Sequence, residues 1–165
     1  MNMTRPTPAE ARTTIADIIG RSVSQAAGLK ESLEVEREAL AQQDTDALDA
    51  VVVSKTEYAG KLQALDDERS ALCKAWGFTS GPGQMDDLID WCDEDAVISE
   101  RWEELMQLAA EGNALNLTNG AIIRLRHQQF ETSLSLLRGV TPGSDTYGRN
   151  GVEAGDLSRR SLAEA

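Results

Sequence analysis

The chain has 165 residues, of which only 4% are aromatic, so a folded core has to be built mainly from Leu, Ile, Val and Ala. Its 28 acidic and 16 basic residues give a formal net charge of −12, which disfavours nucleic acid and anionic membranes as main partners because both bind through basic surfaces. No apolar run approaches the roughly 20 residues of a membrane-spanning helix, and the first residues lack the apolar core of a secretory signal. We therefore expect a cytoplasmic protein without membrane insertion.

The first predicted helix has a clear beginning. Thr7 is a typical capping residue, Pro8 occupies the first helical position, and Glu10 follows the cap by three residues. Apolar and small residues then recur at alternating spacings of three and four, which is a heptad seam. We expect the helix to end near Gln42 or Gln43. The seam consists of Ile15, Ile19, Ser22, Ala26, Leu29, Leu33, Glu36 and Leu40.

A second helix follows after a very short break. Asp44 or Thr45 can cap its first turn, and Gly77 stands where a glycine commonly ends a helix. The break is too short for anything but a tight reversal, so the two helices are predicted to form an antiparallel hairpin. The second seam consists of Leu48, Val51, Lys55, Tyr58, Leu62, Leu65, Arg69, Leu72 and Trp76.

The remaining helical part consists of a loop and two helices. Residues 79–83 (TSGPG) predict a loop because Gly and Pro are dense there. Met85, Leu88, Ile89 and Cys92 then mark one face of a short helix. A long third main helix is predicted from roughly Ala96 to Arg138. Gly112 and Gly120 lie inside this helix and indicate either a close helix contact or a bend.

Several polar residues interrupt the seams, and the sequence leaves their roles open. Glu36, Lys55 and Arg69 are interpreted either as buried ion pairs that fix the register of the helices or as long side chains that extend to solvent at the edge of the seam. Asn116 and Asn119 stand one turn apart among apolar neighbours. They form either a polar pair in the core or part of an exposed face.

No set of residues predicts an enzyme, a metal site or a cofactor site. His127 is the one histidine and has no neighbouring ligand, so we expect a solvent-facing helical residue. The two cysteines, Cys73 and Cys92, are expected to be small core residues. The acidic clusters at 66–68, 86–87 and 93–95 lack the spacing of a calcium loop. They are interpreted as solvated helix faces or as favourable charges at helix N-termini.

The C-terminal part has a different composition from the helices. Gly139 ends the helical pattern, and the residues that follow are rich in Gly, Ser and Arg with few apolar side chains. Such a segment buries too little surface to offset the entropy of ordering it, so we expect it to be disordered when free. The sequence thus predicts an all-α fold, an antiparallel long-helix bundle or coiled-coil hairpin with a short helix and a long third main helix. Residues 1–139 are predicted to form the helical domain, and residues 140–165 are predicted to form a flexible C-terminal tail.

Three segments of the chain resemble the flagellar export chaperones of the FlgN type. The hairpin sequence LEVEREALAQQDTDALDAVVVSKTEYAGKLQALDDERSALCKAWGF resembles the family in its short break at an Asp, its Leu-x-x-Leu-Asp-x-x-Arg element and its Gly-Phe stop. The sequence NALNLTNGAIIRLRHQQFETSLSLLRG is similar to the family's Leu-Asn-x-x-Asn-Gly element and its Leu-Leu-Arg-Gly ending. Tyr-Gly-x-x-Gly in the tail is the third segment. The resemblance covers about residues 25–152.

The resemblance implies a cytoplasmic chaperone of the flagellar type III export system. Such a protein binds the C-terminal helical segments of the hook–filament junction proteins, prevents their premature assembly and delivers them to the export gate and ATPase complex. The alternative interpretation is a helical adaptor or scaffold of another secretion or regulatory complex with a non-flagellar client. The oligomeric state stays open, because heptad seams fit both an intramolecular bundle and a dimer.

The resemblance also implies partner-binding residues in the tail. Tyr147 matches the family position expected to contact the client or the gate, with Gly148 and Gly151 setting the turn around it and Val152 beside them. Leu157 and Leu162 are added because they are apolar residues in an otherwise polar segment. An exposed Tyr offers a large contact area and a hydroxyl group at low conformational cost, which suits recognition.

Overall fold

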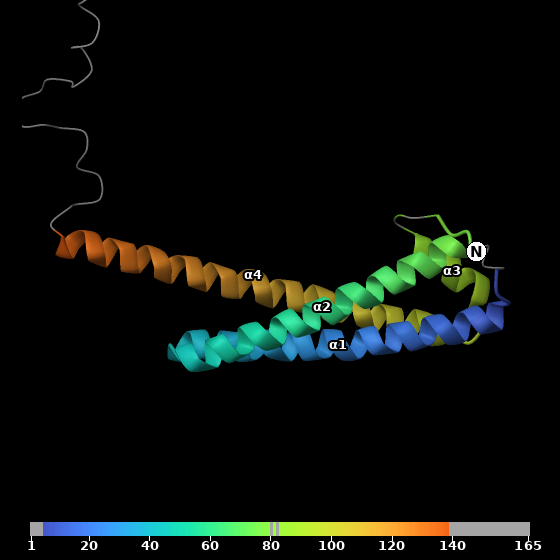
Figure 1. Cartoon of the computed structure of the whole chain (residues 1–165), viewed down its shortest axis with the longest axis horizontal. Coiled ribbons are helices and arrows are strands. Elements are labelled where there is room, and N and C mark those ends of the chain that lie inside the picture. The colour runs from blue at the N-terminus through green and yellow to red at the C-terminus, as the bar shows by residue number, and fades with distance from the viewer. Residues whose placement is uncertain (1–4, 80, 82, 139–165) are drawn as a thin grey trace, which may run out of the picture. The chain divides into compact units, whose positions relative to one another are not determined.

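The computed structural model describes residues 5–79, 81 and 83–138 and confirms the all-α fold class. Four helices follow one another in the described residues (Figure 1). They are α1 (Pro8–Gln42), α2 (Thr45–Ala75), α3 (Gln84–Cys92) and α4 (Val97–Leu137). The chain divides into two compact units, residues 1–123 and 124–165, and α4 runs through the boundary between them.

The predicted helix caps are present at the start of α1 and at the break between α1 and α2. Thr7 accepts a hydrogen bond from the N–H of Glu10, and the Glu10 carboxylate accepts one from the N–H of Thr7 at 2.9 Å, so the capping box is complete. Gln43 ends α1 in the left-handed region at φ 61°. Asp44 then caps α2 by accepting a hydrogen bond from the N–H of Ala47 at 3.0 Å.

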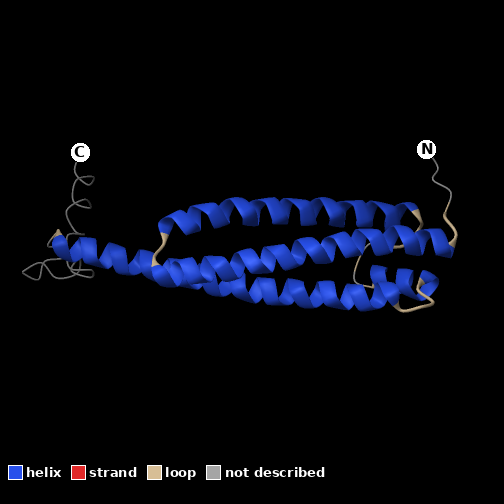
Figure 2. Ribbon diagram, turned by 90° about the horizontal axis from the view of Figure 1, so that it is seen from below, coloured by secondary structure: helices blue, strands red, loops and turns tan. Residues whose placement is uncertain are grey.

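Helices α1 and α2 form the predicted antiparallel hairpin (Figures 1 and 2). The seam residues of α1 are buried or half-buried, and those of α2 face them. A close approach occurs at Gly28, because a Cβ atom there would collide with the ring of Tyr58. The missing side chain of Gly28 therefore makes room for an aromatic residue of α2.

The base of the hairpin, where α1 begins and α2 ends, contains the main apolar cluster. Helix α3 closes this cluster by burying Met85, Leu88 and Cys92. Cys73 and Cys92 are both buried and unlinked, as expected, and burial raises the pKa of both thiols. The other buried members of the cluster are Ala11, Ile15, Ile19, Trp76 and Ile98.

Helix α4 begins at this base and runs parallel to α1 as far as residue 123. Its start is fixed by Asp93, whose carboxylate accepts hydrogen bonds from the N–H groups of Ile98 at 3.1 Å and Ser99 at 2.8 Å. Burial raises the pKa of Asp93, but these hydrogen bonds together outweigh it and hold the pKa below the usual aspartate value.

Contacts at successive positions fix the parallel register of α1 and α4. Three contacts follow one another along the pair: Arg12–Asp95 at 2.6 Å, Lys30–Glu111 at 2.6 Å, and the Asn119 side chain to the Leu33 carbonyl at 2.9 Å.

Gly112 and Gly120 do not interrupt α4, which continues as one α-helix through both positions. Gly112 is buried, and Leu33 lies 3.7 Å from the position that a Cβ atom would take, which is an ordinary van der Waals distance. Within the described residues, none of the helices combines the length and the apolar content that crossing a membrane requires.

The second unit, in its described part, is the end of α4. The sequence places Leu125, Phe130 and Leu137 among the apolar residues of the third main helix, but all three are exposed here, by 57%, 61% and 84%. His127 is exposed, as expected. The helical pattern therefore correctly predicts the helix in this unit, but it does not predict burial.

Candidate functional site: an apolar groove between three helices

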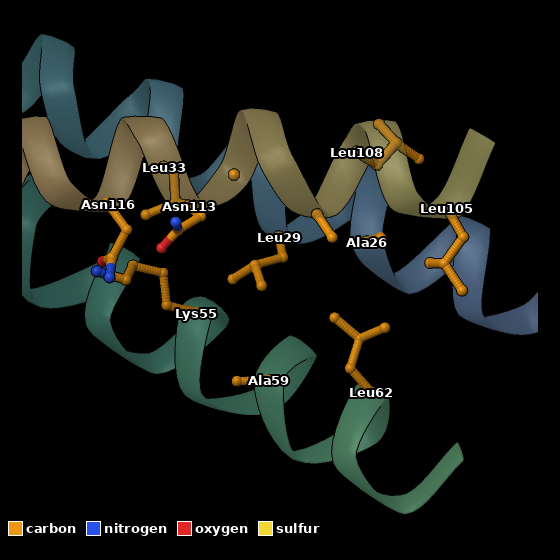
Figure 3. A pocket seen from close by; sticks show the side chains of 12 residues that line it. Ala26, Leu29, Leu33, Lys55, Ala59, Leu62, Leu105, Leu108, Asn113 and Asn116 are labelled. Carbon is orange, nitrogen blue, oxygen red and sulfur yellow. The ribbon is translucent and has the colours of Figure 1, made fainter. Parts of the chain in front are cut away.

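An open apolar groove lies between α1, α2 and the first part of α4, entirely within residues 1–123 (Figure 3). It consists of two adjoining cavities of about 350 and 390 Å³. We call this space the α2–α4 groove, because α1 forms its floor while α2 and α4 form its walls. The two cavities share five lining residues: Leu29, Ala59, Leu62, Leu105 and Ala109.

Small residues explain why the groove is open. Ala59 of α2 and Ala109 of α4 stand on the two walls, and Ala26 and Gly112 add further positions with little or no side chain. Leu62 and Leu105 are only half-buried. Figure 3 shows side chains from all three helices around one common space. The heptad seams thus meet along α1, but α2 and α4 do not fill the space between them.

A buried polar cluster lies beside the groove on the side toward the hairpin tip. Lys55 lines the groove, and its Nζ donates hydrogen bonds to both carboxylate oxygens of Glu36, at 2.8 and 3.0 Å. The side-chain amide of Asn119 donates to Glu36 at 2.8 Å and to the Leu33 carbonyl at 2.9 Å. Glu36 is 5% exposed and Asn119 is 1% exposed. The cluster therefore joins α1, α2 and α4.

The sequence left two interpretations open for Glu36 and Lys55 and two for Asn116 and Asn119, and the cluster distinguishes between them. Glu36 and Lys55 form an ion pair in the seam, which favours the register interpretation for these two residues. Asn119 is buried, whereas Asn116 is exposed and lines the groove. The two asparagines thus lie in different environments and do not form a pair.

The other end of the groove is formed around Arg69. Its guanidinium group lies 2.7 Å from the Asp66 carboxylate and 5.4 Å from the centre of the Trp102 ring. It also donates to the Gln84 side chain at 3.4 Å, which ties α2 to α3. Because the Arg69 side chain is only 13% exposed, it packs within the seam instead of extending into solvent.

The lining of the groove carries no charge without a partner in the described structure. Lys55 is neutralised by Glu36, and Arg69 is neutralised by Asp66. The remaining lining is apolar apart from Ser22, Gln63 and two asparagines, Asn113 and Asn116. An occupant that presents an apolar surface therefore gains more from this groove than a charged small molecule does.

The described residues contain no cluster of three or more His, Cys, Asp or Glu side chains placed to hold a metal ion. The acidic cluster at residues 93–95 acts structurally: Asp93 caps α4, and Asp95 pairs with Arg12 of α1. The fold and groove thus define a class of protein, an all-α protein with an open apolar groove between its helices.

None of the residues that line this groove is among the partner-binding residues predicted from the sequence. Tyr147, Gly148, Gly151, Val152, Leu157 and Leu162 all lie outside the described residues, as does the predicted tail at 140–165. The sequence analysis did not predict the groove. One feature of the sequence is consistent with a groove. Small residues such as Ala26, Ala59 and Ala109 occur near the apolar positions of the helices, and they leave space where larger side chains would fill it.

Comparison with known protein families matches residues 11–155 to the family described as FlgN protein. The match spans most of the chain, so the protein belongs to the FlgN family and is a flagellar export chaperone. This is a chaperone family and not an enzyme family, and its members bind flagellar substrate proteins. No curated protein and no solved structure matches the chain.

Proposed function

We propose that this chaperone acts in the cytoplasm on the hook–filament junction proteins. It binds their C-terminal helical segments, prevents premature assembly, and delivers them to the export gate and its ATPase complex. The observation that supports this proposal is the open α2–α4 groove, with its apolar lining of Leu29, Leu62 and Leu105. In a family of export chaperones, such a surface suits a client whose own apolar helix face must be covered before export.

The physical requirements of export fit this arrangement. A client helix that will later pack in an assembly has an apolar stripe that promotes aggregation while it is uncovered. A groove of half-buried leucines covers such a stripe without a covalent bond or an enzymatic step, so release requires only competition or unfolding of the client. The net charge of −12 keeps the chaperone itself soluble during this exchange.

The tail has a separate role in the proposal. We assign residues 140–165 to contact with the client or the gate, with Tyr147 as the main contact and Gly148, Gly151 and Val152 around it. Leu157 and Leu162 provide further apolar contacts. A segment that orders only on binding combines specificity with easy release, which suits transfer from one partner to the next.

The test is co-purification of the full chain with each of the two junction proteins from the same organism. We expect complexes at micromolar concentration, and we expect removal of the C-terminal helical segments of the junction proteins to abolish them. If neither junction protein binds while a non-flagellar protein of a secretion or regulatory complex does, the adaptor interpretation replaces this one.

A further inference from the structure

Two aromatic rings lie close together at the base of the hairpin, where α2 ends and α3 packs. Phe78 follows the end of α2 and Trp91 belongs to α3, and their ring centres are 5.5 Å apart with the ring planes inclined by 55°. Both rings are half-buried and pack partly against the buried apolar cluster. We call these two residues the aromatic pair. Neither of them lines the α2–α4 groove.

The end of α2 determines where Phe78 lies. Gly77 has a left-handed backbone at φ 90°, a conformation that glycine adopts without strain. The N–H of Gly77 donates to the Lys74 carbonyl at 3.1 Å, and the N–H of Phe78 donates to the Cys73 carbonyl at 2.9 Å. These two hydrogen bonds form a Schellman motif, which ends a helix and turns the following apolar residue back toward it. Phe78 is therefore held by the backbone as well as by its packing.

The guanidinium group of Arg5 covers the aromatic pair. Its central carbon lies 4.3 Å from the centre of the Trp91 ring and 5.0 Å from the centre of the Phe78 ring. Arg5 precedes the Thr7 cap of α1, whose beginning lies beside α3 (Figure 1). A planar guanidinium stacks on aromatic faces at such distances better than a compact ammonium group does. The aromatic pair thus has the geometry of a site for an arginine side chain.

Helix α3 and the turn after it, which carry Trp91, are strongly acidic. Residues 84–95 contain six Asp or Glu residues and no Lys or Arg. Two of the six have structural partners, because Asp93 caps α4 and Asp95 pairs with Arg12. The other four are exposed and form no ion pair within the described part of the chain. They are Asp86, Asp87, Asp90 and Glu94. Such a surface attracts a basic segment of another molecule.

The contact between Arg5 and the aromatic pair is easily exchanged. Arg5 is exposed and lies outside the helices, so no helical hydrogen bond holds its backbone. An exposed cation–π contact is weak, and it has to offset the loss of backbone and side-chain freedom in the segment before α1. An arginine of another molecule can therefore replace Arg5, and the exposed carboxylates favour one that has further basic residues beside it.

We propose that the aromatic pair is a binding site for an arginine of a partner protein, and that Arg5 occupies this site as an internal substitute while the partner is absent. The partner presents its arginine in an exposed basic segment, and the other cations of that segment face the acidic residues of α3. The site shares no lining residue with the α2–α4 groove. The inference therefore does not depend on which client the chaperone carries.

The test uses two short flexible peptides that differ in one side chain. The central position, flanked by lysines, is arginine in one peptide and lysine in the other, so the two have the same charge. Binding to the isotope-labelled full chain is followed by the NMR signals of the indole N–H groups. Trp102 is an internal control, because Arg69 already lies over its ring. We expect the Trp91 signal to move and the Trp102 signal to stay, and the arginine peptide to bind about threefold or more tightly than the lysine peptide.

Arg5→Ala and Arg12→Ala provide a matched comparison. Each removes one positive charge from the same end of the molecule, but only Arg5 covers the aromatic pair. Because Arg5→Ala removes the internal competitor, we expect it to bind the arginine peptide about threefold or more tightly than the parent does. Arg12→Ala is expected to stay within about twofold of the parent. Phe78→Leu, added to Arg5→Ala, is expected to reverse the gain, and circular dichroism melting verifies that each variant is folded.

Three results would overturn the inference. A Trp91 signal that does not move with the arginine peptide, in the parent and in Arg5→Ala, would make the Arg5 contact a purely internal one. An equal gain in Arg5→Ala and Arg12→Ala would assign binding to general charge attraction and not to the aromatic pair. Equal binding of the two peptides would remove the selectivity for a guanidinium group.

Discussion

Glu36 lies almost completely out of water, yet it accepts hydrogen bonds from Lys55 of α2 and Asn119 of α4. A carboxylate loses much hydration free energy on burial and regains it only from well-placed donors. Because the donors come from different helices, the cluster disfavours arrangements in which α2 or α4 is shifted along α1. We therefore interpret Glu36 as a residue that specifies register.

The first prediction concerns this carboxylate. Glu36→Ala removes the acceptor of the Lys55 ammonium and one of the two acceptors of the Asn119 amide, so we expect a loss of about 2–3 kcal/mol in the free energy of unfolding. Urea denaturation measures the loss. Glu34→Ala, at an exposed position on the same helix, is the control and should have little effect. A loss equally small for both variants would show that the buried cluster does not contribute to stability.

The second prediction compares two glycines in the hairpin. Gly60 is exposed in α2 and has nothing within 4 Å of the position of a Cβ atom, so Gly60→Ala should stabilise the protein by about 0.5–1 kcal/mol through helix propensity. Gly28→Ala should bring no such gain, because its methyl group collides with the Tyr58 ring. Thermal unfolding of the two variants provides the measurement. A similar gain for both would mean that Tyr58 moves aside at no cost.

At the scale of the elements, local signals in the sequence correctly predicted the helix boundaries. Each of these caps joins two residues three positions apart, Thr7 with Glu10 and Asp44 with Ala47. Both partners of the hydrogen bond can therefore be recognised in a short stretch of sequence. The cap of α4 was harder to assign. Asp93 stands well before the helix and reaches Ile98 and Ser99 across the left-handed residue Ala96.

The groove could not be predicted in the same way. A heptad seam indicates which face of a helix is apolar, but it does not indicate how far apart two helices lie when both pack on a third. The asparagines illustrate this limit: Asn116 and Asn119 have similar sequence surroundings, yet only Asn119 meets the Leu33 carbonyl and Glu36 of α1. Their environments depend on long-range packing.

The third prediction concerns the start of α4 and its pH dependence. The pKa of Asp93 is lower in the folded state than its ordinary value, so its stabilising effect is complete above that ordinary value of 3.8 and is lost as the pH falls through the folded-state pKa. Asp93→Ala should cost about 1 kcal/mol at neutral pH.

The measurement is urea unfolding of Asp93→Ala and the parent between pH 7 and about pH 3. The difference between the two proteins should shrink at the acid end, where the parent's Asp93 becomes protonated. Asp90→Ala, at an exposed aspartate of α3, is the control. A difference that stays constant throughout this range would contradict the role assigned to the ionised carboxylate.

At the scale of the whole molecule, the chain combines a helical part with a segment of very different composition. We propose that these parts have separate roles, residues 1–139 as the folded body and residues 140–165 as a partner-binding tail. The fourth prediction follows. Deletion of residues 140–165 should leave the helical circular dichroism and the melting temperature nearly unchanged while weakening the binding of clients or the gate.

Tyr147→Ala is the matched point variant for that deletion. It should reduce partner binding, measured by isothermal titration with a client's C-terminal fragment, and leave the melting temperature at the parent value. A drop of several degrees on either change would assign the tail to the folded body. Unchanged partner binding by both variants would instead place recognition entirely in the helices.

The parallel pairing of α1 and α4 has a consequence for synthesis on the ribosome. Glu36 and Lys55 are separated by 19 residues, so the hairpin can form early, whereas the bond from Asn119 to Leu33 spans 86 residues. Contacts between such distant residues form late, because the chain between them must first be made and then closed into a loop. Until then the apolar floor on α1 is uncovered on the nascent chain. This chaperone therefore passes through a stage in which the apolar surface of its own hairpin is exposed to water.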